Sequence, residues 1–400
     1  MVVLKFGGSV LSSLAKIREV ASHIAKRKKA GEAICVVVSA IGGTTDRLHK
    51  FALAFTQNPP KRELDMLLTV GERISASLLS IALGDLGVKA LSLTGSQVGI
   101  ITDATHTDAR IYEIKGGHLK QCLRRDIIPV VAGFQGVSYK KEITTLGRGG
   151  SDITAVALAA FLRAKRCEIY KDVSGIYTED PKEFKNLNQI QELSYEEGLE
   201  LTSSGSEILH PRALALANKY NIEIVVRSLK NSGGTMIREK KEVEKANVLA
   251  LTHRKNLVRF TLLSVPKVSR CLSQVVSQLA INKIPLLFFA HGVPYHNRFD
   301  LSFILKQSEE RVAQGVLLRL KEKVKGEKLE VKRDIGSISL IGPQVGTDLE
   351  ILKTVFDCFQ KEGIHIDAFT TTATNITLYL KKKDIRKGIQ RLLRKFRLKR

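Results

Sequence analysis

The chain lacks several patterns that would assign it to a common class of protein. Its 400 residues include no tryptophan and only five cysteines, which are spaced far apart and never form a CxxC pair. Scattered cysteines in odd number disfavour structural zinc or a disulfide framework and fit a reducing compartment. No apolar run approaches the ~20 residues of a membrane-spanning helix. Because Met1 leads directly into a predicted strand, we also expect no signal peptide and a cytoplasmic location.

The familiar phosphate-binding and dinucleotide-binding motifs are also missing. The dipeptide Gly-Lys occurs nowhere, which excludes a GxxxxGK[ST] phosphate loop. Neither an HRD catalytic loop nor a GxGxxG fingerprint is present, which disfavours protein kinases and dinucleotide-binding enzymes. Any phosphate chemistry in this chain must therefore use a different glycine turn.

The chain has fewer acidic than basic residues: 40 Asp and Glu against 64 Lys and Arg, which gives a formal net charge of +24. Residues 381–400 hold eleven of the basic residues and one acid. Such a run fits either a nucleic-acid or anionic-membrane patch or the solvated face of a terminal helix. Five apolar residues recur there at helical spacing: Ile385, Ile389, Leu392, Leu393 and Phe396. No zinc-finger or RNA-binding motif accompanies the charge. The pattern favours the solvated face, without a nucleic-acid or membrane partner.

The first ~245 residues alternate predicted strands and helices, which is typical of an α/β fold with a mainly parallel sheet sandwiched by helices. Glycine, serine and threonine turns recur at the carboxyl ends of the strands, the edge where ligands bind in such sheets. The predicted strands are 2–6, 33–38, 89–93, 127–132, 166–170 and 222–227, and the main predicted helices are 14–29, 64–83 and the segment from 152 to 162.

The order of predicted strands and helices changes after residue 245. Residues 257–334 read strand, helix, strand, strand, helix, strand, and residues 335–400 begin the same cycle but end before the last strand. This is a repeat of two α+β units of the βαββαβ type. We infer that the strand 248–252 supplies the missing edge of the second unit, so that the two units interlock. The predicted domains are therefore 1–245 and 246–400.

Two glycine turns carry the strongest chemical signal. In the segment 144–154, three glycines surround Arg148, and a predicted N-cap pair, Ser151-Asp152, follows directly. Glycines let the backbone approach a ligand, helix-start amides face an anion, and an arginine fork grips a carboxylate or phosphate. The second turn, Lys5-Phe-Gly-Gly-Ser9, ends the first strand and can cradle a phosphate with its amides beside the Lys5 charge. Each turn alone also fits an ordinary strand-to-helix connection.

The order of motifs along the chain is more specific than either turn. Lys5-Phe-Gly-Gly8, Ser39-Ala40 with Thr45, Gly71-Glu72, Leu146-Gly-Arg-Gly-Gly-Ser-Asp152, Lys171-Asp-Val-Ser-Gly-Ile-Tyr-Thr-Glu-Asp-Pro181 and Leu209-His-Pro-Arg212 follow one another. This series resembles the aspartate kinases of the amino acid kinase family. The paired βαββαβ units resemble that family's tandem ACT regulatory domains, so the resemblance covers the whole chain.

The resemblance implies a reaction and its participants. ATP, with Mg²⁺ on its phosphates and no protein ligand to the metal, would transfer its γ-phosphate to the side-chain carboxylate of L-aspartate. This is the first step toward lysine and diaminopimelate, threonine and methionine. A carboxylate is already ionised at pH 7, so no general base is required. The resemblance also implies a homodimer and feedback control by an amino acid at the ACT units, lysine first among the candidates.

The resemblance further implies a role for each site residue. Lys5 and Asp152 are the catalytic pair, in which Lys5 neutralises the γ-phosphoryl group and Asp152 positions Lys5. Arg148 holds the substrate α-carboxylate and Glu72 its α-ammonium group. The remaining aspartate contacts are Ser39, Thr45, Gly149, Gly150 and Ser151. The nucleotide contacts are Lys5, Gly7, Gly8, Ser9, Lys171, Asp172, Tyr177, Lys182 and Lys230.

Some positions depart from the family's pattern. Ser9-Val10 stands where Thr-Ser is usual, Lys171 replaces a common threonine, and residues 286–295 lack the hydroxyl-rich strand of lysine-sensitive members. Two alternatives stay open: a kinase of the same fold for another small amino-acid carboxylate, and a catalytically vestigial basic regulatory protein. Retention of all four of Lys5, Glu72, Arg148 and Asp152 argues against the second.

Overall fold

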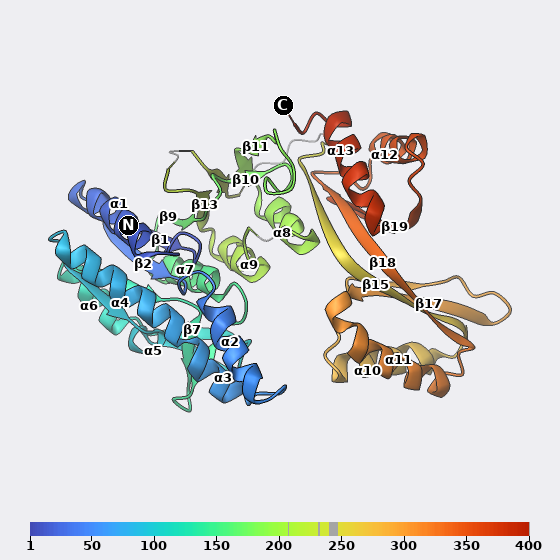
Figure 1. Ribbon diagram of the computed structural model, residues 1–400, viewed down its shortest axis with the longest axis horizontal. Helices are drawn as coiled ribbons and strands as arrows, with labels where there is room; N and C mark the ends of the chain where they lie inside the picture. Colours follow the sequence, from blue (N-terminus) through green and yellow to red (C-terminus); the bar gives the residue numbers. More distant parts are fainter. Residues whose placement is uncertain (207, 231–232, 240–246, 400) are drawn as a thin grey trace. The chain divides into compact units, whose positions relative to one another are not determined.

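The computed structural model describes residues 1–206, 208–230, 233–239 and 247–399, and it forms two compact units, Met1–Glu244 and Lys245–Arg400 (Figure 1). Together they carry the predicted fold class: a mainly parallel α/β sheet with helices on both faces, and two ACT-like α+β units.

The first unit is built on a sheet in which eight described strands follow the order β12-β14-β13-β9-β1-β2-β6-β3. All neighbours are parallel except β13 and β14. Its central strands are continuous apolar runs, as expected for strands buried on both faces. The strands are β1 (Val2–Phe6), β2 (Ile34–Val38), β3 (Ala90–Leu93), β6 (Ile128–Ala132), β9 (Arg166–Tyr170), β12 (Glu192–Leu193), β13 (Glu223–Arg227) and β14 (Thr235–Ile237).

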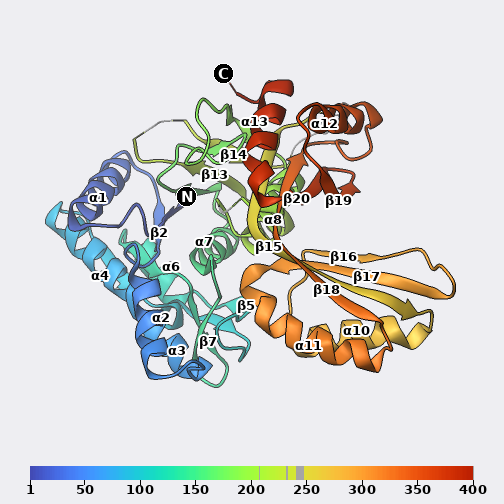
Figure 2. The same ribbon diagram turned by 45° about the vertical axis from the view of Figure 1, so that its right-hand side comes forward.

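Helices cover both faces of this sheet. On one face, α1 (Leu14–Lys29) and α4 (Val70–Asp85) pack against the alternate strand residues Leu4 and Phe6. On the other face, α7 (Gly150–Phe161) contacts β1, β2 and β9 (Figure 2). Because side chains alternate along a strand, Lys5 faces α7. The other helices of the unit are α2 (Thr44–Phe55), α3 (Lys61–Leu68), α5 (Gly95–Val98), α6 (Gly117–Arg124), α8 (Tyr195–Ser204) and α9 (Pro211–Tyr220).

A second, smaller sheet lies within the same unit and has the order β5-β4-β7-β8. Its strands are β4 (Ile100–Thr102), β5 (Ile111–Ile114), β7 (Gln135–Ser138) and β8 (Ile143–Thr145). The short strands β10 (Ile176–Tyr177) and β11 (Gln189–Ile190) form a separate antiparallel pair. Strand β8 leads directly into the Arg148 turn, so this small sheet determines where that turn begins.

Two predicted helix boundaries differ from the structure. The predicted helix 64–83 is two helices, α3 and α4, that meet at Thr69. The predicted N-cap pair Ser151-Asp152 is wrong: α7 begins at Gly150, and its N-cap is Gly149 in the left-handed region at φ +73°. Glycine tolerates this conformation without a Cβ penalty, so the helix starts before the polar pair and places both side chains in its first turn.

The stretch Lys61–Asp85 is the one part of the described chain that is long and apolar enough to cross a membrane, by length and composition only. It consists of α3 and α4, and Ala76, Leu79 and Leu83 lie in the core beneath the main sheet. The α4 part of the stretch is therefore a core helix of the first unit.

The second unit contains one six-stranded sheet, β16-β17-β15-β18-β20-β19, with neighbouring strands antiparallel. The predicted strand 248–252 and the first strand of the predicted unit 257–334 are a single strand, β15 (Ala250–Pro266). The last strand of that unit and the first strand of the unit 335–400 are likewise a single strand, β18 (Lys328–Ile341). The other elements are α10 (Ser269–Ile281), β16 (Phe288–His291), β17 (Arg298–Lys306), α11 (Glu310–Lys323), α12 (Leu349–Lys361), β19 (Ile366–Thr372), β20 (Asn375–Lys381) and α13 (Ile385–Lys395).

Each long strand serves both βαββαβ units. The first part of β15 pairs with the last part of β18, with Ala250 opposite Ile341 and Thr252 opposite Ser339. The later part of β15 pairs with the first part of β18 and with β17. Residues that precede the first unit thus supply the fourth strand of the second. The terminal helix α13 buries Ile385, Ile389, Leu392 and Leu393, which leaves its basic residues on the outer face.

Candidate active site

The candidate site lies at the carboxyl edge of the main sheet. There β9, β1, β2 and β6 are parallel neighbours, so the turns that follow them lie side by side. Gly7-Gly8 follows β1, Ser39-Ala40 follows β2, Gly133 follows β6 and Lys171-Asp172 follows β9. Ligands of open α/β sheets bind at this edge. The fold therefore gathers four motifs that the sequence scatters over more than 160 residues.

Lys5 and Asp152 form a buried ion pair, with Lys5 Nζ 2.7 Å from Asp152 Oδ1 and side chains 6% and 5% exposed. Lys171 Nζ is 4.0 Å from the other carboxylate oxygen. Burial alone would raise the pKa of Asp152, but the charges of Lys5 and Lys171 outweigh it and hold that pKa below its ordinary value. The Asp152 carboxylate therefore stays ionised at neutral pH and holds Lys5 Nζ in place at 2.7 Å.

Glu72 lies in the first turn of α4 and is 3% exposed. Its Oε1 accepts a hydrogen bond from the Ala40 amide at 3.1 Å, while Oε2 is buried without a hydrogen-bond partner within the described chain. Burial raises the pKa of Glu72 to about 7, and the nearby Lys5 charge only partly offsets this shift. A buried carboxylate oxygen without a donor costs free energy. Glu72 Oε2 can therefore accept a hydrogen bond from a cationic group of a ligand.

The turn around Arg148 has the backbone that its glycines allow. Gly147 and Gly149 adopt φ values of +79° and +73°, and a Cβ on Gly149 would lie 2.7 Å from the His210 side chain. Arg148 itself is exposed, whereas Gly150 and Ser151 are buried in the first turn of α7. The backbone of the turn is thus tightly packed while the arginine side chain reaches solvent.

Ser39 and Thr45 belong to the turn after β2. The Ser39 amide donates to the Phe6 carbonyl at 3.1 Å, which ties this turn to the end of β1. Thr45 is the second residue of α2, and both side chains are partly buried. The Gly7 amide donates to the Tyr170 carbonyl at 3.1 Å, so it is already used within the fold.

The predicted nucleotide contacts come from neighbouring turns. The Lys171 amide donates to the Arg227 carbonyl at 2.9 Å, which joins the turn after β9 to the end of β13, three residues before Lys230. Lys182 Nζ lies 3.6 Å from Asp172 Oδ2, and both side chains are largely exposed. Ser9 and Lys230 are also exposed, and Tyr177 is partly buried in β10.

Two residues that were not predicted from the sequence as site residues, Asp65 and Arg212, bond the segment just before the Arg148 turn. Asp65 is fully buried and accepts hydrogen bonds from the Thr145 hydroxyl and the Thr107 amide. Arg212 donates to the Leu146 carbonyl at 2.8 Å. The Leu-His-Pro-Arg motif did include Arg212, but its partners are more than 60 residues away in the sequence. His210 is the N-cap of α9, and its ring accepts a hydrogen bond from the Arg212 amide.

Comparison with known proteins agrees with this geometry. Residues 1–228 match the amino acid kinase family. The chain belongs to the amino acid kinase family, and within it to the aspartokinases. It is 38% identical to the aspartokinase of Corynebacterium glutamicum, over 100% of this chain and 96% of that protein. It is 36% identical to an aspartokinase of Bacillus sp. strain MGA3, over 100% of this chain and 97% of the relative.

A solved structure has the same fold. Aspartokinase III of Escherichia coli, in complex with aspartate and ADP, superposes with a TM-score of 0.82 over 98% of this chain and 99% of that one, at 24% identity. At this identity the likeness supports the fold alone. It extends over both units of the chain.

Proposed function

We propose that this chain is an ATP:L-aspartate 4-phosphotransferase that forms 4-phospho-L-aspartate and ADP. The relatives that match its full length are named aspartokinase. The observation that carries the proposal for this chain is the buried Lys5–Asp152 ion pair at the carboxyl edge of the sheet. Burying such an ion pair costs folding free energy. The same site also contains the buried carboxylate of Glu72. Trapping the acyl phosphate with hydroxylamine tests the activity directly.

The chemistry needs positive charge and alignment more than proton transfer. An oxygen of the aspartate side-chain carboxylate attacks the γ-phosphorus, and the bond from that phosphorus to the β,γ-bridging oxygen breaks as ADP leaves. Negative charge on the transferring group is stabilised by Lys5, which Asp152 holds in place. We assign a backbone contact with the phosphates to the Gly8 amide rather than to Gly7, because the Gly7 amide is bonded to Tyr170.

Aspartate is held at both ends of its backbone. Arg148 binds the α-carboxylate through its planar fork, and Glu72 Oε2 accepts from the α-ammonium group. Ser39 and Thr45 contact the side chain from the turn after β2. The start of α7 provides the amides of Gly149 and Ser151 for a carboxylate. The Gly150 amide donates to the Gly147 carbonyl at 3.0 Å, so we assign Gly150 a close backbone approach to the substrate rather than a hydrogen bond.

The nucleotide lies over the turns after β9 and β13 in this proposal, with Tyr177 near the adenine and Lys182 near the phosphates. The contacts are Lys5, Gly8, Ser9, Lys171, Asp172, Tyr177, Lys182 and Lys230. Within the described chain, no group of three or more His, Cys, Asp or Glu could hold a metal ion. In this proposal Mg²⁺ would come bound to the ATP phosphates and would offset their charge, and we assign it no protein ligand.

The raised pKa of Glu72 predicts a pH dependence of aspartate binding. Only the ionised carboxylate attracts the substrate ammonium group, and the pKa of Glu72 is about 7. For each pH unit below this pKa, the KM for aspartate therefore rises about tenfold. A Glu72→Gln variant should bind aspartate weakly with a flat profile from pH 5.5 to 8. Parallel wild-type and variant profiles over this range would contradict the assignment.

The same shift predicts how the stability of the ligand-free protein depends on pH. The folded state keeps the Glu72 proton up to about pH 7, whereas the unfolded state loses it near pH 4.5. Between these values the folded state binds more protons, so stability falls as pH rises, by about 3 kcal/mol in total. Urea unfolding of wild type and Glu72→Gln between pH 4.5 and 8 measures this. The difference in unfolding free energy between wild type and Glu72→Gln should change from pH 4.5 to about 7 and level off above pH 7.

We also propose that the second unit is regulatory, binds a pathway amino acid with lysine first among the candidates, and joins two chains in a homodimer. A pocket of about 670 Å³ lies between α12 and β19, lined by Phe356, Phe359, Phe369 and Asp367 among others. Lys332 Nζ forms an ion pair with Asp367 Oδ1 at 2.6 Å. The other oxygen, Asp367 Oδ2, is buried without a hydrogen-bond partner in the described chain. An apolar pocket with such an oxygen suits an amino acid with a cationic group.

The regulatory proposal is tested by assaying the kinase with lysine, threonine and meso-diaminopimelate. We expect lysine to inhibit the wild type and Asp367→Asn to need at least about tenfold more lysine, which corresponds to the loss of one charge-assisted hydrogen bond. Asp357→Asn is the matched control, because Asp357 lies on α12 outside the pocket lining and forms an exposed ion pair with Lys353. No response of the wild type to any of the three amino acids would contradict feedback control.

The proposed domains are a catalytic domain at 1–245 and a regulatory region at 246–400. We propose a cytoplasmic location, since the free cysteines Cys35, Cys122, Cys167, Cys271 and Cys358 are all buried and unpaired, as in a reducing compartment.

A further inference from the structure

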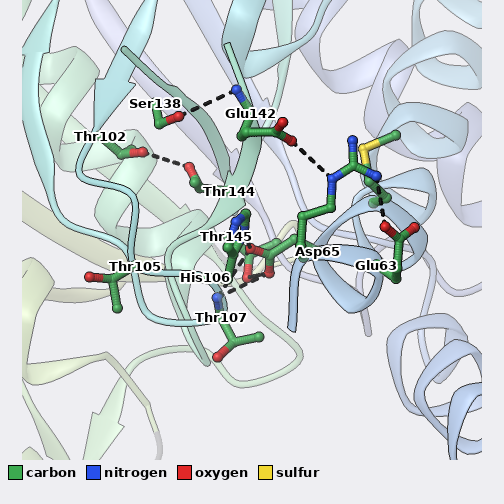
Figure 3. A network of polar contacts seen from close by, with 12 residues as sticks. Glu63, Asp65, Thr102, Thr105, His106, Thr107, Ser138, Glu142, Thr144 and Thr145 are labelled. Carbon is green, nitrogen blue, oxygen red and sulfur yellow. Dashed lines mark hydrogen bonds and ion pairs between the residues drawn. The ribbon is translucent and has the colours of Figure 1, made fainter. Parts of the chain in front are cut away.

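Asp65 is a fully buried carboxylate that none of the proposed substrate contacts uses. It projects from α3 toward the small sheet and the loop before β5 (Figure 3). His106 Nδ1 lies 2.7 Å from Asp65 Oδ2, the Thr107 amide donates to both oxygens at 3.1 Å, and the Thr145 hydroxyl donates to Oδ1 at 2.6 Å. A buried carboxylate is expensive unless donors surround it. This one joins two segments that lie about 40 residues apart in the sequence.

The segment that Asp65 holds is strained. Thr107 has φ +73°, and a β-branched residue in this region is a clear conformational outlier. Strain of this kind persists only where the surroundings enforce it, and it concentrates at functional sites. Here the Thr107 amide is bonded to Asp65, which supplies that enforcement.

Arg212 holds the same two segments from another side. Its guanidinium donates to the Leu146 carbonyl, the Ala109 carbonyl and Asp108 Oδ1, each at 2.8 Å. The segments are also bonded to each other, because the Ala109 amide donates to the Thr145 carbonyl at 2.8 Å. Asp65 and Arg212 thus fix the strand end Thr145-Leu146 at two consecutive residues.

Arg148 comes two residues after this fixed point. Between them, Gly147 packs so closely that a Cβ would lie 3.0 Å from Asp108 Oδ1. The turn therefore has little freedom in its backbone, while the Arg148 side chain remains exposed. We propose that Asp65 and Arg212 are positioning residues, which hold the Arg148 turn in the geometry that receives the aspartate α-carboxylate. This inference rests on the proposed role of Arg148, and a misplacement of about 1 Å is enough to impair such a clamp.

Thr145 offers a nearly isosteric test. Thr145→Val removes the hydroxyl that bonds Asp65, and Thr145→Ser keeps it. We expect Thr145→Val to raise the KM for aspartate about tenfold, as for the loss of one buried hydrogen bond to a charged group. The kcat and the KM for ATP should stay within about twofold, and Thr145→Ser should resemble the wild type.

Thr144→Val is the matched control. Thr144 is the preceding residue of β8, is equally buried, and bonds the Thr102 hydroxyl at 2.6 Å instead of Asp65. It should lower the Tm about as much as Thr145→Val and leave the KM for aspartate unchanged. Asp108→Ala removes an Arg212 contact at a side chain that is 67% exposed, so it folds even where a buried variant does not, and it should raise the same KM about threefold.

The outcomes separate the inference from the proposed function. An unchanged KM for aspartate in both Thr145→Val and Asp108→Ala overturns the positioning roles. An equal rise in Thr144→Val, or an equal rise in the KM for ATP, also overturns them, because it indicates general destabilisation. A wild type that forms no aspartyl phosphate contradicts the proposed function instead. Calorimetric titration of each variant with aspartate gives a binding readout that needs no turnover.

Discussion

Replacing Arg148 with alanine is expected to raise the KM for aspartate by about 30- to 1000-fold, with little loss of stability. The side chain is exposed, so its removal leaves no cavity and no buried partner. A bidentate arginine–carboxylate contact contributes about 2–4 kcal/mol when its partner is bound, or roughly 30- to 1000-fold in affinity. The measurement is steady-state kinetics with aspartate varied at saturating ATP.

Two further variants sharpen the Arg148 result. Arg148→Lys keeps the charge but loses the planar fork, so its KM should lie between those of the wild type and the alanine variant. Arg110→Ala removes an equally exposed arginine from the loop before β5 and should leave the KM within about twofold. An Arg148→Ala enzyme with the wild-type KM for aspartate would show that the α-carboxylate is bound elsewhere.

Replacing Asp152 with asparagine is expected to lower both stability and turnover. Lys5 would remain 6% exposed with its nearest carboxylate gone. Breaking a buried ion pair by removing one partner costs about 3–5 kcal/mol. Loss of an oriented charge at the transferring phosphoryl group lowers kcat by about 10²- to 10³-fold. Urea unfolding and kcat measured on the same preparation check both effects.

A double variant separates the structural role of the pair from its catalytic role. Lys5→Met with Asp152→Leu replaces both charges by apolar groups of similar size and should recover most of the lost stability, while kcat stays low. As a surface control, Asp357→Asn breaks an exposed pair with Lys353 and should cost at most about 1 kcal/mol. Recovery of wild-type kcat in the double variant would remove Lys5 and Asp152 from the mechanism.

Much of the fold followed from local patterns. The strands Val2–Phe6 and Arg166–Tyr170 and the helix Leu14–Lys29 have the predicted bounds, because apolar runs and helical periodicity act over short distances. The long strands β15 and β18 were predicted in pieces, since polar residues such as His253, Arg254 and Asp334 interrupt the apolar pattern there. Their continuity comes from pairing with distant strands, which no local window contains.

The candidate site divides in the same way. Lys5, Glu72 and Asp152 could be named from the order of motifs, and the structure places Lys5 against Asp152. Asp65 and Arg212 could not be named as supports of the Arg148 turn, because their partners are 40 to 100 residues away. The small sheet that carries Thr145 was also missed, since its strands have only three or four residues.

The central claim is that this chain phosphorylates the side-chain carboxylate of aspartate. Its most direct test is the purified full-length chain incubated with MgATP and hydroxylamine, with aspartate, glutamate or N-acetylglutamate as acceptor. We predict ATP-dependent aspartyl hydroxamate, with turnover on glutamate and N-acetylglutamate lower by at least about a hundredfold, as expected where Arg148 and Glu72 fix the substrate backbone. Hydroxamate formed faster from another acceptor, or from none of the three, would contradict the account.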